Sequence, residues 1–294
     1  YTAGDAGEIT NLGNEAITLD DTSLAVATLN TLNGNTTGVV NAATINTLTG
    51  GAAAMNTAYT AGDAGEITNL GNEAITLDDT SLAVATLNTL NGNTTGAVNA
   101  ATINTLTGGA AAMNTAYTAA GNGEISNLGN EAITLDDTSL AVATLNTLNG
   151  NTTGVVNAAT VGTLTGGAAA MNTAYTAGGN GEITNLGNEA ITLDDTSLAV
   201  ATLNTLNGNT TGAVNAATVT TLTGATVAMN TAYTAGGNGE ISGLGNEAIT
   251  LDDTTLAVSA LNTLDGNTTG VVNAGTVNTL TGAAAAALVH SYCA

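Results

Sequence analysis

Residues 15–34 read EAITLDDTSLAVATLNTLNG, and this stretch decides the fold. Its first six residues alternate polar and apolar side chains, which is the pattern of a half-buried β-strand. Asp21, Thr22 and Ser23 are residue types that favour a helix N-terminus, and the apolar residues after them recur at helical spacing. The stretch therefore predicts a strand and then a helix, which these polar residues cap and which Gly34 ends.

A second strand and a second helix are expected in the residues that follow. Residues 38–42 or 43–46 have a strand-like pattern, and residues 52–59, after a pair of glycines, have the pattern of a short helix. Strict alternation of strands and helices predicts parallel strands joined by crossover helices. We therefore predict an α/β right-handed solenoid of stacked strand–helix coils with a parallel sheet. An all-β solenoid is the alternative, because abundant threonine and asparagine disfavour helices.

The pattern repeats along the chain of 294 residues with a period of 58. Equivalent tyrosines mark the period at Tyr1, Tyr59, Tyr117, Tyr175 and Tyr233. A shift of 26 residues also superposes residues 15–33 on residues 41–59, so we expect two coils in each repeat. The whole chain, 1–294, is then a single solenoid array. Its repeats are 1–58, 59–116, 117–174, 175–232 and 233–290, with a divergent tail at 287–294.

The composition excludes several classes of function. The chain contains 0 Lys+Arg and 23 Asp+Glu, for a net charge of −23, although 43% of its residues are hydrophobic. Without cationic side chains it cannot neutralise nucleic-acid phosphates, bind anionic lipid through a basic patch, or supply a Schiff-base lysine. No apolar run reaches the roughly 18 residues that a membrane-spanning helix needs. High hydrophobicity with only 8% charged residues indicates a folded chain.

A pair of aspartates recurs at the end of the first expected strand of each repeat. Stacked coils would place these pairs in a column, which is a candidate Ca²⁺ ladder because Ca²⁺ prefers clustered carboxylates. The interpretation that we favour is that the aspartates end the strand and cap the positive end of a helix. No other cofactor is expected. The ladder candidates are Asp20, Asp21, Asp78, Asp79, Asp136, Asp137, Asp194, Asp195, Asp252 and Asp253.

Three further groups of residues recur in every repeat. Glu8 and Glu15, with their copies, are expected to be exposed charges that keep the protein soluble. Tyr59 and its copies are expected to pack in the core at a helix end with the hydroxyl in water, rather than to stack on a ligand. The Asn-Thr-Thr sequences fit both an N-glycosylation acceptor and a plain turn, and we favour the turn. They begin at Asn35, Asn93, Asn151, Asn209 and Asn267.

The sequence does not predict an enzyme. The single histidine, His290, and the single cysteine, Cys293, both lie in the divergent tail, three residues apart. A Cys–His pair without a third group to orient it is a poor nucleophile. Serine, aspartate and glutamate occur in the repeats, but without a histidine beside them no catalytic residues are expected.

The run from Ile9 to Leu24, followed by residues 29–38 and by TINTLTG at 44–50, resembles repeats of giant cyanobacterial cell-surface proteins. These include the swimming-motility surface protein of marine Synechococcus and repeat proteins described as haemolysin-type or calcium-binding. The resemblance covers nearly all of residues 1–286 and implies an extracellular structural role without catalytic residues. The chain lacks the glycine-rich GGxGxD nonapeptide of calcium-binding β-rolls, so the resemblance carries over no Ca²⁺ site.

These observations together predict a structural protein at the cell surface or outside the cell, as part of a rod, filament, surface layer or fibre. The alternative is an adhesin, or an ice- or ligand-binding module, that uses threonine-rich faces with assistance from Ca²⁺. Because Tyr1 begins in mid-repeat, we expect the first coil to be covered by further repeats of the same polypeptide or by a head-to-tail copy. The cell envelope and glycans are the other expected partners; nucleic acid and a transmembrane segment are not expected.

Overall fold

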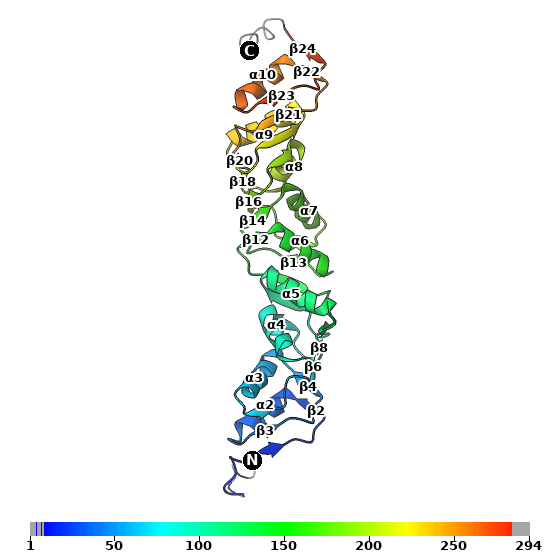
Figure 1. The fold of residues 1–294 in the computed structure, drawn as a ribbon, viewed down its shortest axis with the longest axis vertical. Coiled ribbons are helices and arrows are strands. Elements are labelled where there is room, and N and C mark those ends of the chain that lie inside the picture. The colour runs from blue at the N-terminus through cyan, green and yellow to red at the C-terminus, as the bar shows by residue number, and fades with distance from the viewer. Residues whose placement is uncertain (1–3, 5–6, 8, 284–294) are drawn as a thin grey trace. The chain divides into compact units, whose positions relative to one another are not determined.

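The computed structural model describes residues 4, 7 and 9–283 of the chain (Figure 1). Tyr1, Glu8 and the tail at 287–294, which includes His290 and Cys293, lie outside the described residues. The chain divides into two compact units, the first formed by residues 1–136 and 147–157 and the second by residues 137–146 and 158–294. The same succession of strands and helices builds each unit.

The elements of the first unit can be followed from the N-terminus in Figure 1. They are β1 (Ile17–Thr18), β2 (Ser23–Ala25), α2 (Val26–Gly34), β3 (Val40–Asn41), β4 (Thr47–Gly50), α3 (Ala52–Asp63), β5 (Ile67–Thr68), β6 (Ala74–Leu77), β7 (Ser81–Ala83), α4 (Val84–Asn93), β8 (Val98–Asn99), β9 (Thr105–Gly108), α5 (Ala110–Gly121), β10 (Ile125–Ser126), β11 (Ala132–Leu135) and β13 (Val156–Asn157).

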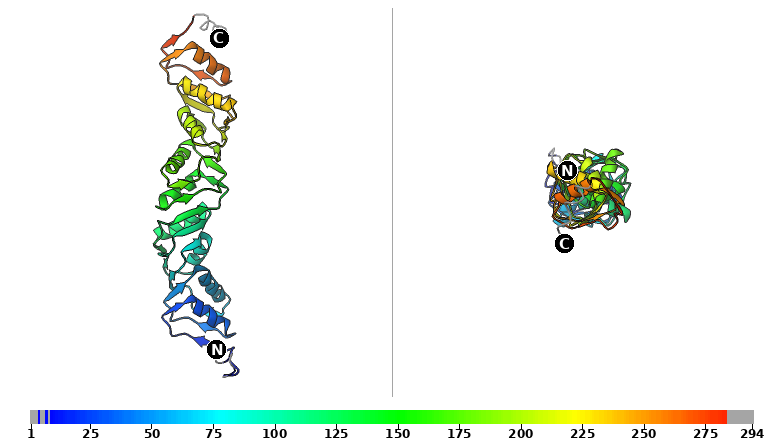
Figure 2. Two further views of the ribbon diagram at one scale, coloured as in Figure 1. Left: turned by 180° about the vertical axis from the view of Figure 1, so that it is seen from behind. Right: turned by 90° about the horizontal axis from the view of Figure 1, so that it is seen from above.

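The second unit continues the pattern, and Figure 2 shows its helices and strands from behind. Its elements are β12 (Ser139–Ala141), β14 (Thr163–Gly166), α7 (Ala168–Gly179), β15 (Ile183–Thr184), β16 (Ala190–Leu193), β17 (Ser197–Ala199), α8 (Val200–Asn209), β18 (Val214–Asn215), β19 (Thr221–Gly224), α9 (Thr226–Gly237), β20 (Ile241–Ser242), β21 (Ala248–Leu251), β22 (Thr255–Ala257), α10 (Val258–Asn267), β23 (Val272–Asn273) and β24 (Thr279–Thr281). Helix α6 (Val142–Asn151) contributes residues to both units.

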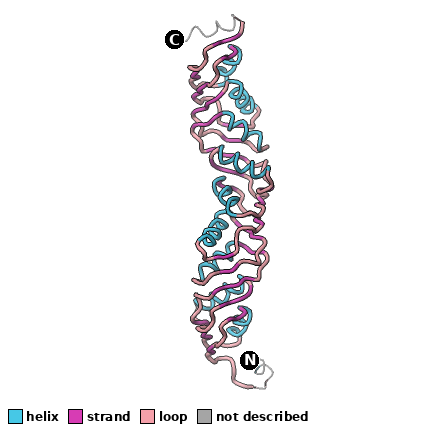
Figure 3. The backbone as a smooth tube through the Cα atoms, turned by 90° about the vertical axis from the view of Figure 1, so that its right-hand side faces the viewer, coloured by secondary structure: helices cyan, strands magenta, loops and turns pink. Residues whose placement is uncertain are grey.

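The α/β prediction is confirmed, and the all-β alternative is wrong. Two described helices begin in each of the first four 58-residue repeats, and short strands precede each of them. Figure 3 shows helix and strand alternating along the tube. The helix expected from residue 24 begins two residues later, because Ser23–Ala25 pairs as strand β2 with β4. The helix expected at 52–59 is longer than predicted and ends at Asp63.

Threonine-rich segments form helices because the threonine hydroxyls find partners inside the helix. Thr31 donates its hydroxyl hydrogen to the carbonyl of Ala27 at 2.8 Å, one turn earlier, and Thr89 does the same to Ala85 at 2.9 Å. Such a bond stabilises a threonine rotamer that is compatible with the helix. The apolar face of each helix then supplies the packing; in α4 it consists of Val84, Leu87 and Leu90, all buried.

Strand pairing is parallel throughout the pairs that the structure describes within each unit. In the first unit one sheet has the order β10-β8-β6-β4-β2. Its register aligns apolar side chains in an inward column and small polar ones in an outward column. The inward column is Leu24, Leu48, Ile75, Val98 and Ile125, and the outward column is Ala25, Thr49, Thr76, Asn99 and Ser126.

The second unit repeats this register with equivalent residues. The sheet of order β12-β14-β16-β18-β20 stacks Leu140, Leu164, Ile191, Val214 and Ile241 in its inward column. Helices add Met171, Ala174 and Tyr175 of α7 to the same core. Because one coil alone cannot cover these apolar side chains, each coil depends on its neighbours for burial.

Candidate functional site

In four of the five repeats a glutamate is buried against a tyrosine. The Tyr117 hydroxyl donates a hydrogen bond to Glu131 Oε2 at 3.0 Å, and the backbone N–H of Gly129 donates to the same oxygen at 2.9 Å. Glu131 is 0% exposed, and Tyr117 is 7% exposed. The same hydrogen bond recurs at 3.1 Å for Tyr59–Glu73, 3.0 Å for Tyr175–Glu189 and 2.8 Å for Tyr233–Glu247.

This cluster corrects two predictions. The copies of Glu15 were expected to be exposed, but Glu73, Glu131, Glu189 and Glu247 are fully buried. The tyrosine rings pack in the core as predicted, but their hydroxyls bond to these glutamates instead of water. The alternation of polar and apolar residues in this segment identifies the glutamate as polar but does not show which residue it bonds to. The usable signal was the constant separation of 14 residues between tyrosine and glutamate in every repeat.

The backbone around the glutamate is held by a threonine and a glycine. Thr152 donates its hydroxyl hydrogen to the carbonyl oxygen of Glu131 at 3.1 Å and accepts one from the N–H of Gly154 at 3.0 Å. A Cβ atom at Gly154 would collide with the carbonyl group of Glu131, so only glycine fits there. The carboxylate is therefore fixed by its own backbone as well as by Tyr117.

Burial makes the hydroxyl group of the tyrosine a weaker acid than usual. Burial raises the pKa of the Tyr117 hydroxyl well above its usual value of 10.0; a hydrogen bond with Thr152 opposes this, and the charge of Glu131 reinforces it. The phenol therefore stays neutral and acts as a hydrogen-bond donor at ordinary pH. The other oxygen, Oε1, of Glu73, Glu131 and Glu189 is buried without a hydrogen-bond partner among the described residues. The cluster joins a helix to the loop before the next strand.

The aspartate pairs cap helices, but not the helices that the sequence suggested. Asp79 Oδ2 accepts a hydrogen bond at 2.7 Å from the N–H of Ala52, the first residue of α3. Asp195 caps Ala168 of α7, and Asp253 caps Thr226 of α9, each at 2.7 Å. The N-cap residues of these helices themselves make no side-chain cap. Each aspartate thus completes the helix that began 27 residues earlier.

The physical reason is the short strand between the aspartates and the next helix. Residues Ser81–Ala83 form β7, so Asp79 lies too far from the start of α4 at Val84 to cap it. Within residues 4, 7 and 9–283, no three His, Cys, Asp or Glu side chains form a group that could hold a metal ion. The Ca²⁺ ladder through the aspartate column stays a prediction.

A ladder of asparagines connects successive helices. In the first unit, Asn30 donates its side-chain N–H to the carbonyl of Ala54, Asn56 to Thr86, and Asn88 to Ala112, at 2.9, 3.1 and 2.9 Å. In the second unit the same bonds run from Asn172 to Thr202, Asn204 to Ala228 and Asn230 to Ala260. These uncharged bonds take the place that ion pairs occupy in chains that contain lysine and arginine.

The Asn-Thr-Thr sequences belong to the same network. Asn93 donates to Asn56 Oδ1 at 3.0 Å, and Thr95 donates its hydroxyl hydrogen to the carbonyl of Gly71 at 3.2 Å. Asn209 makes the matching bond to Asn172 at 2.9 Å. Asn93 and Asn209 are the last residues of α4 and α8, so the amide nitrogen that glycosylation would modify bonds the end of one helix to the preceding helix, and the turn expected for these sequences begins after the asparagine.

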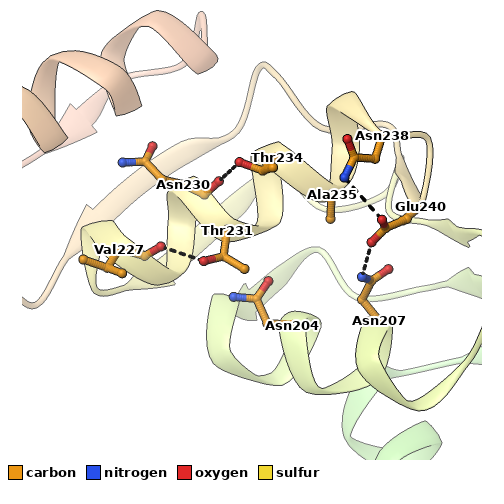
Figure 4. Close-up of a pocket in the computed structure, with 9 residues that line it drawn as sticks. All are labelled: Asn204, Asn207, Val227, Asn230, Thr231, Thr234, Ala235, Asn238 and Glu240. Atoms are coloured by element: carbon orange, nitrogen blue, oxygen red, sulfur yellow. Dashed lines mark hydrogen bonds between the residues drawn. The ribbon is translucent and has the colours of Figure 1, made fainter.

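A groove lies between α8 and α9 in the second unit (Figure 4). It has a volume of about 530 Å³. Asn204 and Asn207 of α8 form one wall, and α9 forms the other; Val227 lies at one end and Glu240 at the opposite end. The expectations drawn from the sequence did not include this groove.

Comparison of the chain with models of known protein families, with curated proteins and with solved structures found no match. None of the helices in the described part of the chain is both long and apolar enough to cross a membrane. The arrangement of the recurrent polar residues is therefore the basis for a functional proposal.

Proposed function

We propose that this chain is a structural protein, part of an extracellular rod, filament or cell-surface layer, and not an enzyme. The observation that carries the proposal is the use of the recurrent polar side chains as links between coils. The asparagines, the capping aspartates and the Thr-Thr turns all bond to residues 21 to 37 positions away, which belong to a neighbouring coil. Polar groups that are used in this way hold an array together rather than bind a substrate.

The chemistry of the links suits repeated use along an array. In solenoids, each repeat contacts only its neighbours, so stability is nearly a sum of repeat and interface contributions. The distance of the tyrosine–glutamate bond stays between 2.8 and 3.1 Å in all four described copies, and the aspartate cap is 2.7 Å in three. Such regularity supports a role in which length and stiffness matter.

The charge composition supports a location outside the cell. A chain with 0 Lys+Arg offers no cleavage site to trypsin-like proteases. With a net charge of −23, the carboxylates of the chain repel one another in dilute solution. In seawater-like salt of about 0.7 M, this repulsion is screened beyond about 4 Å. An extracellular saline setting therefore removes the main cost of this composition.

Surface labelling of intact cells tests the proposal. An antibody raised against the 58-residue repeat should label the outside of cells that express the native gene, in immunogold electron microscopy. Brief proteinase K treatment of intact cells should remove the signal, whereas a cytoplasmic control protein should survive it. Labelling that appears only after the cells are broken would reject the proposal.

A second candidate is an adhesin or ice-binding module that uses threonine rows. The observation in its favour is that Thr49 and Thr76 are adjacent in the outward column of a parallel sheet, with an equivalent pair at Thr165 and Thr192. The row is short, since Asn99 and Ser126 follow in the first of these columns. Thermal hysteresis of the purified protein, compared with a Thr49→Val, Thr76→Val variant, tests the ice-binding form; no hysteresis in the wild type removes it.

A further inference from the structure

Among the residues that line it, the groove between α8 and α9 differs from the equivalent grooves of α4–α5 and α6–α7 by one side chain. Val227 stands where other repeats have Ala53, Ala111 and Ala169. Its side chain is 71% exposed, so it is an apolar surface that nothing in the described chain covers. This valine gives the groove a larger exposed apolar end than the alanine of its equivalents does.

The hydroxyl groups in the groove have already used their hydrogens. Thr231 donates to the carbonyl of Val227 at 3.0 Å, and Thr234 donates to the carbonyl of Asn230 at 2.8 Å (Figure 4). A hydroxyl group has a single hydrogen to donate and two lone pairs to accept with. Both threonines are exposed, so a ligand can reach their oxygens. Because their hydrogens are already donated, they can only accept hydrogen bonds from that ligand.

Glu240 fixes the charge at the opposite end of the groove. Its Oε2 accepts a hydrogen bond from Asn207 at 3.0 Å, and its Oε1 accepts one from Asn238 at 3.3 Å. Figure 4 shows both amides directed at the carboxylate. A carboxylate has about four lone-pair sites, so these two bonds hold it in place and leave room for a bidentate donor. Glu240 is exposed, and the whole chain contains no lysine or arginine to pair with it.

We propose that this groove binds a basic peptide segment of a partner protein, with an arginine or lysine on Glu240 and an apolar side chain on Val227. The groove offers hydroxyl acceptors, a fixed negative charge and an apolar end, and this combination is complementary to a donor-rich cation on an apolar stem. The proposal goes beyond the structural role and does not depend on it.

The length of the groove indicates a peptide rather than a small cation. Val227 and Asn238 are separated by eleven residues of α9 and its cap, which corresponds to about 16 Å at about 1.5 Å per residue. An extended peptide covers that distance with about five residues at about 3.3 Å each. A free guanidinium or ammonium ion reaches Glu240 but cannot contact Val227 at the same time.

Fluorescence anisotropy with labelled, end-blocked peptides tests this inference on the full chain. The probes are Leu-Ser-Gly-Ser-Arg and its reversed sequence, each compared with a peptide in which neutral citrulline replaces arginine. We expect the better arginine peptide to bind about tenfold more tightly than its citrulline counterpart, and its affinity to fall with added NaCl.

Three variants locate the binding. Val227→Ala, which restores the residue of the other repeats, should lower the affinity of this groove about fivefold, to that of its equivalents. Glu240→Gln should lower the affinity of this groove about tenfold, so that both variants lose the tight component of the binding curve and keep only the weaker binding of the equivalent grooves. The matched control is Glu124→Gln, because Glu124 has the same two amide partners, Asn91 at 2.9 Å and Asn122 at 3.4 Å, beside an alanine. This control should leave the affinity unchanged. Unfolding midpoints of all variants establish that they are folded.

Three outcomes overturn the inference. Equal affinity for the citrulline and arginine peptides would show that the cation does not contribute to binding. Equal losses of affinity in Glu240→Gln and Glu124→Gln would show diffuse attraction to a chain of net charge −23. Spermidine that binds as tightly as the peptide, with no effect of Val227→Ala, would make the groove a site for small cations. If Glu240→Gln fails to fold, the Val227→Ala and citrulline comparisons still decide between these results.

Discussion

Tyr117 donates a hydrogen bond to Glu131 across 3.0 Å, in a core where Glu131 is 0% exposed and where the sequence provides no lysine or arginine to neutralise it. A buried carboxyl group without a cationic partner is held only by hydrogen bonds. Those bonds come from one phenol and one backbone N–H, both on the same oxygen. The stability of each repeat should therefore be sensitive to this pair.

Truncation of the glutamate should be costly. Glu131→Ala leaves the Tyr117 hydroxyl and the Gly129 N–H without an acceptor and opens a cavity, so we expect a loss of about 2–4 kcal/mol. Glu131→Gln keeps an acceptor oxygen and removes the buried charge, so it should cost about 1 kcal/mol or less. Urea unfolding followed by circular dichroism measures both. Exposed Glu124→Ala is the control, and an equally small effect of Glu131→Ala would contradict the role of the cluster.

Alkaline pH should destabilise the array through its tyrosines. The folded-state pKa of Tyr59, Tyr117, Tyr175 and Tyr233 lies above the value of 10.0 for the unfolded chain, chiefly because of burial. Below pH 10 both states hold the proton, so the stabilisation is complete; above it the unfolded state releases protons first, and stability falls. Unfolding midpoints between about pH 8 and pH 12 should show this loss.

Replacement of the four tyrosines by phenylalanine provides the control for the alkaline loss. That variant has fewer groups to ionise, so its stability should depend much less on pH above about 10, although it is lower at neutral pH. Tyrosinate absorbance of the wild type should rise together with unfolding. Ionisation of all tyrosines while the circular dichroism spectrum stays native would contradict the burial of these hydroxyls.

The capping aspartates should be distinguishable from their neighbours. Asp79→Ala removes the acceptor for the N–H of Ala52, and loss of such a cap costs about 1 kcal/mol. Asp78→Ala is the matched control, because Asp78 is an exposed aspartate on the same turn. Thermal unfolding of the two variants should rank Asp79→Ala as the less stable. Equal midpoints would mean that the cap contributes nothing measurable.

Salt should stabilise the protein because its charges have one sign. With a net charge of −23, we expect the melting temperature to rise with NaCl, and divalent cations to act somewhat more strongly at equal ionic strength. Melting curves in NaCl with and without Ca²⁺ measure this. A large effect of micromolar Ca²⁺ would establish the aspartate ladder that we regard as the weaker interpretation. No response to either salt would reject the argument from repulsion.

The sequence was sufficient for the architecture. The 58-residue period, the strand–helix alternation and the second coil within each period were all legible, because apolar residues must recur wherever coils stack. The boundary that was missed, at β2, is a three-residue strand of Ser-Leu-Ala, and its identity depends on pairing with Thr47–Thr49 of the next coil. Local pattern cannot supply a partner that lies 24 residues away.

The same limitation explains the errors at the candidate sites. Glu73 is polar in an alternating stretch, which suggested exposure, but its burial depends on Tyr59 and on the glycine turn before it. Asp79 precedes one helix in the sequence and caps another in space. The groove could have been noticed from a cluster of three changes among nearly identical repeats, where Ala225, Thr226 and Val227 stand in place of Gly167, Ala168 and Ala169.

The placement of the caps has a consequence for the order of synthesis. Helix α3 begins at Ala52, but the side chain that caps it, Asp79, is 27 residues further along the chain. On the ribosome, a helix is therefore made well before the residue that completes its first turn. Asp195 and Asp253 cap α7 and α9 in the same way, so the first turn of each of these helices is completed only after a further 27 residues have been made. The nascent protein should therefore close progressively from the N-terminus.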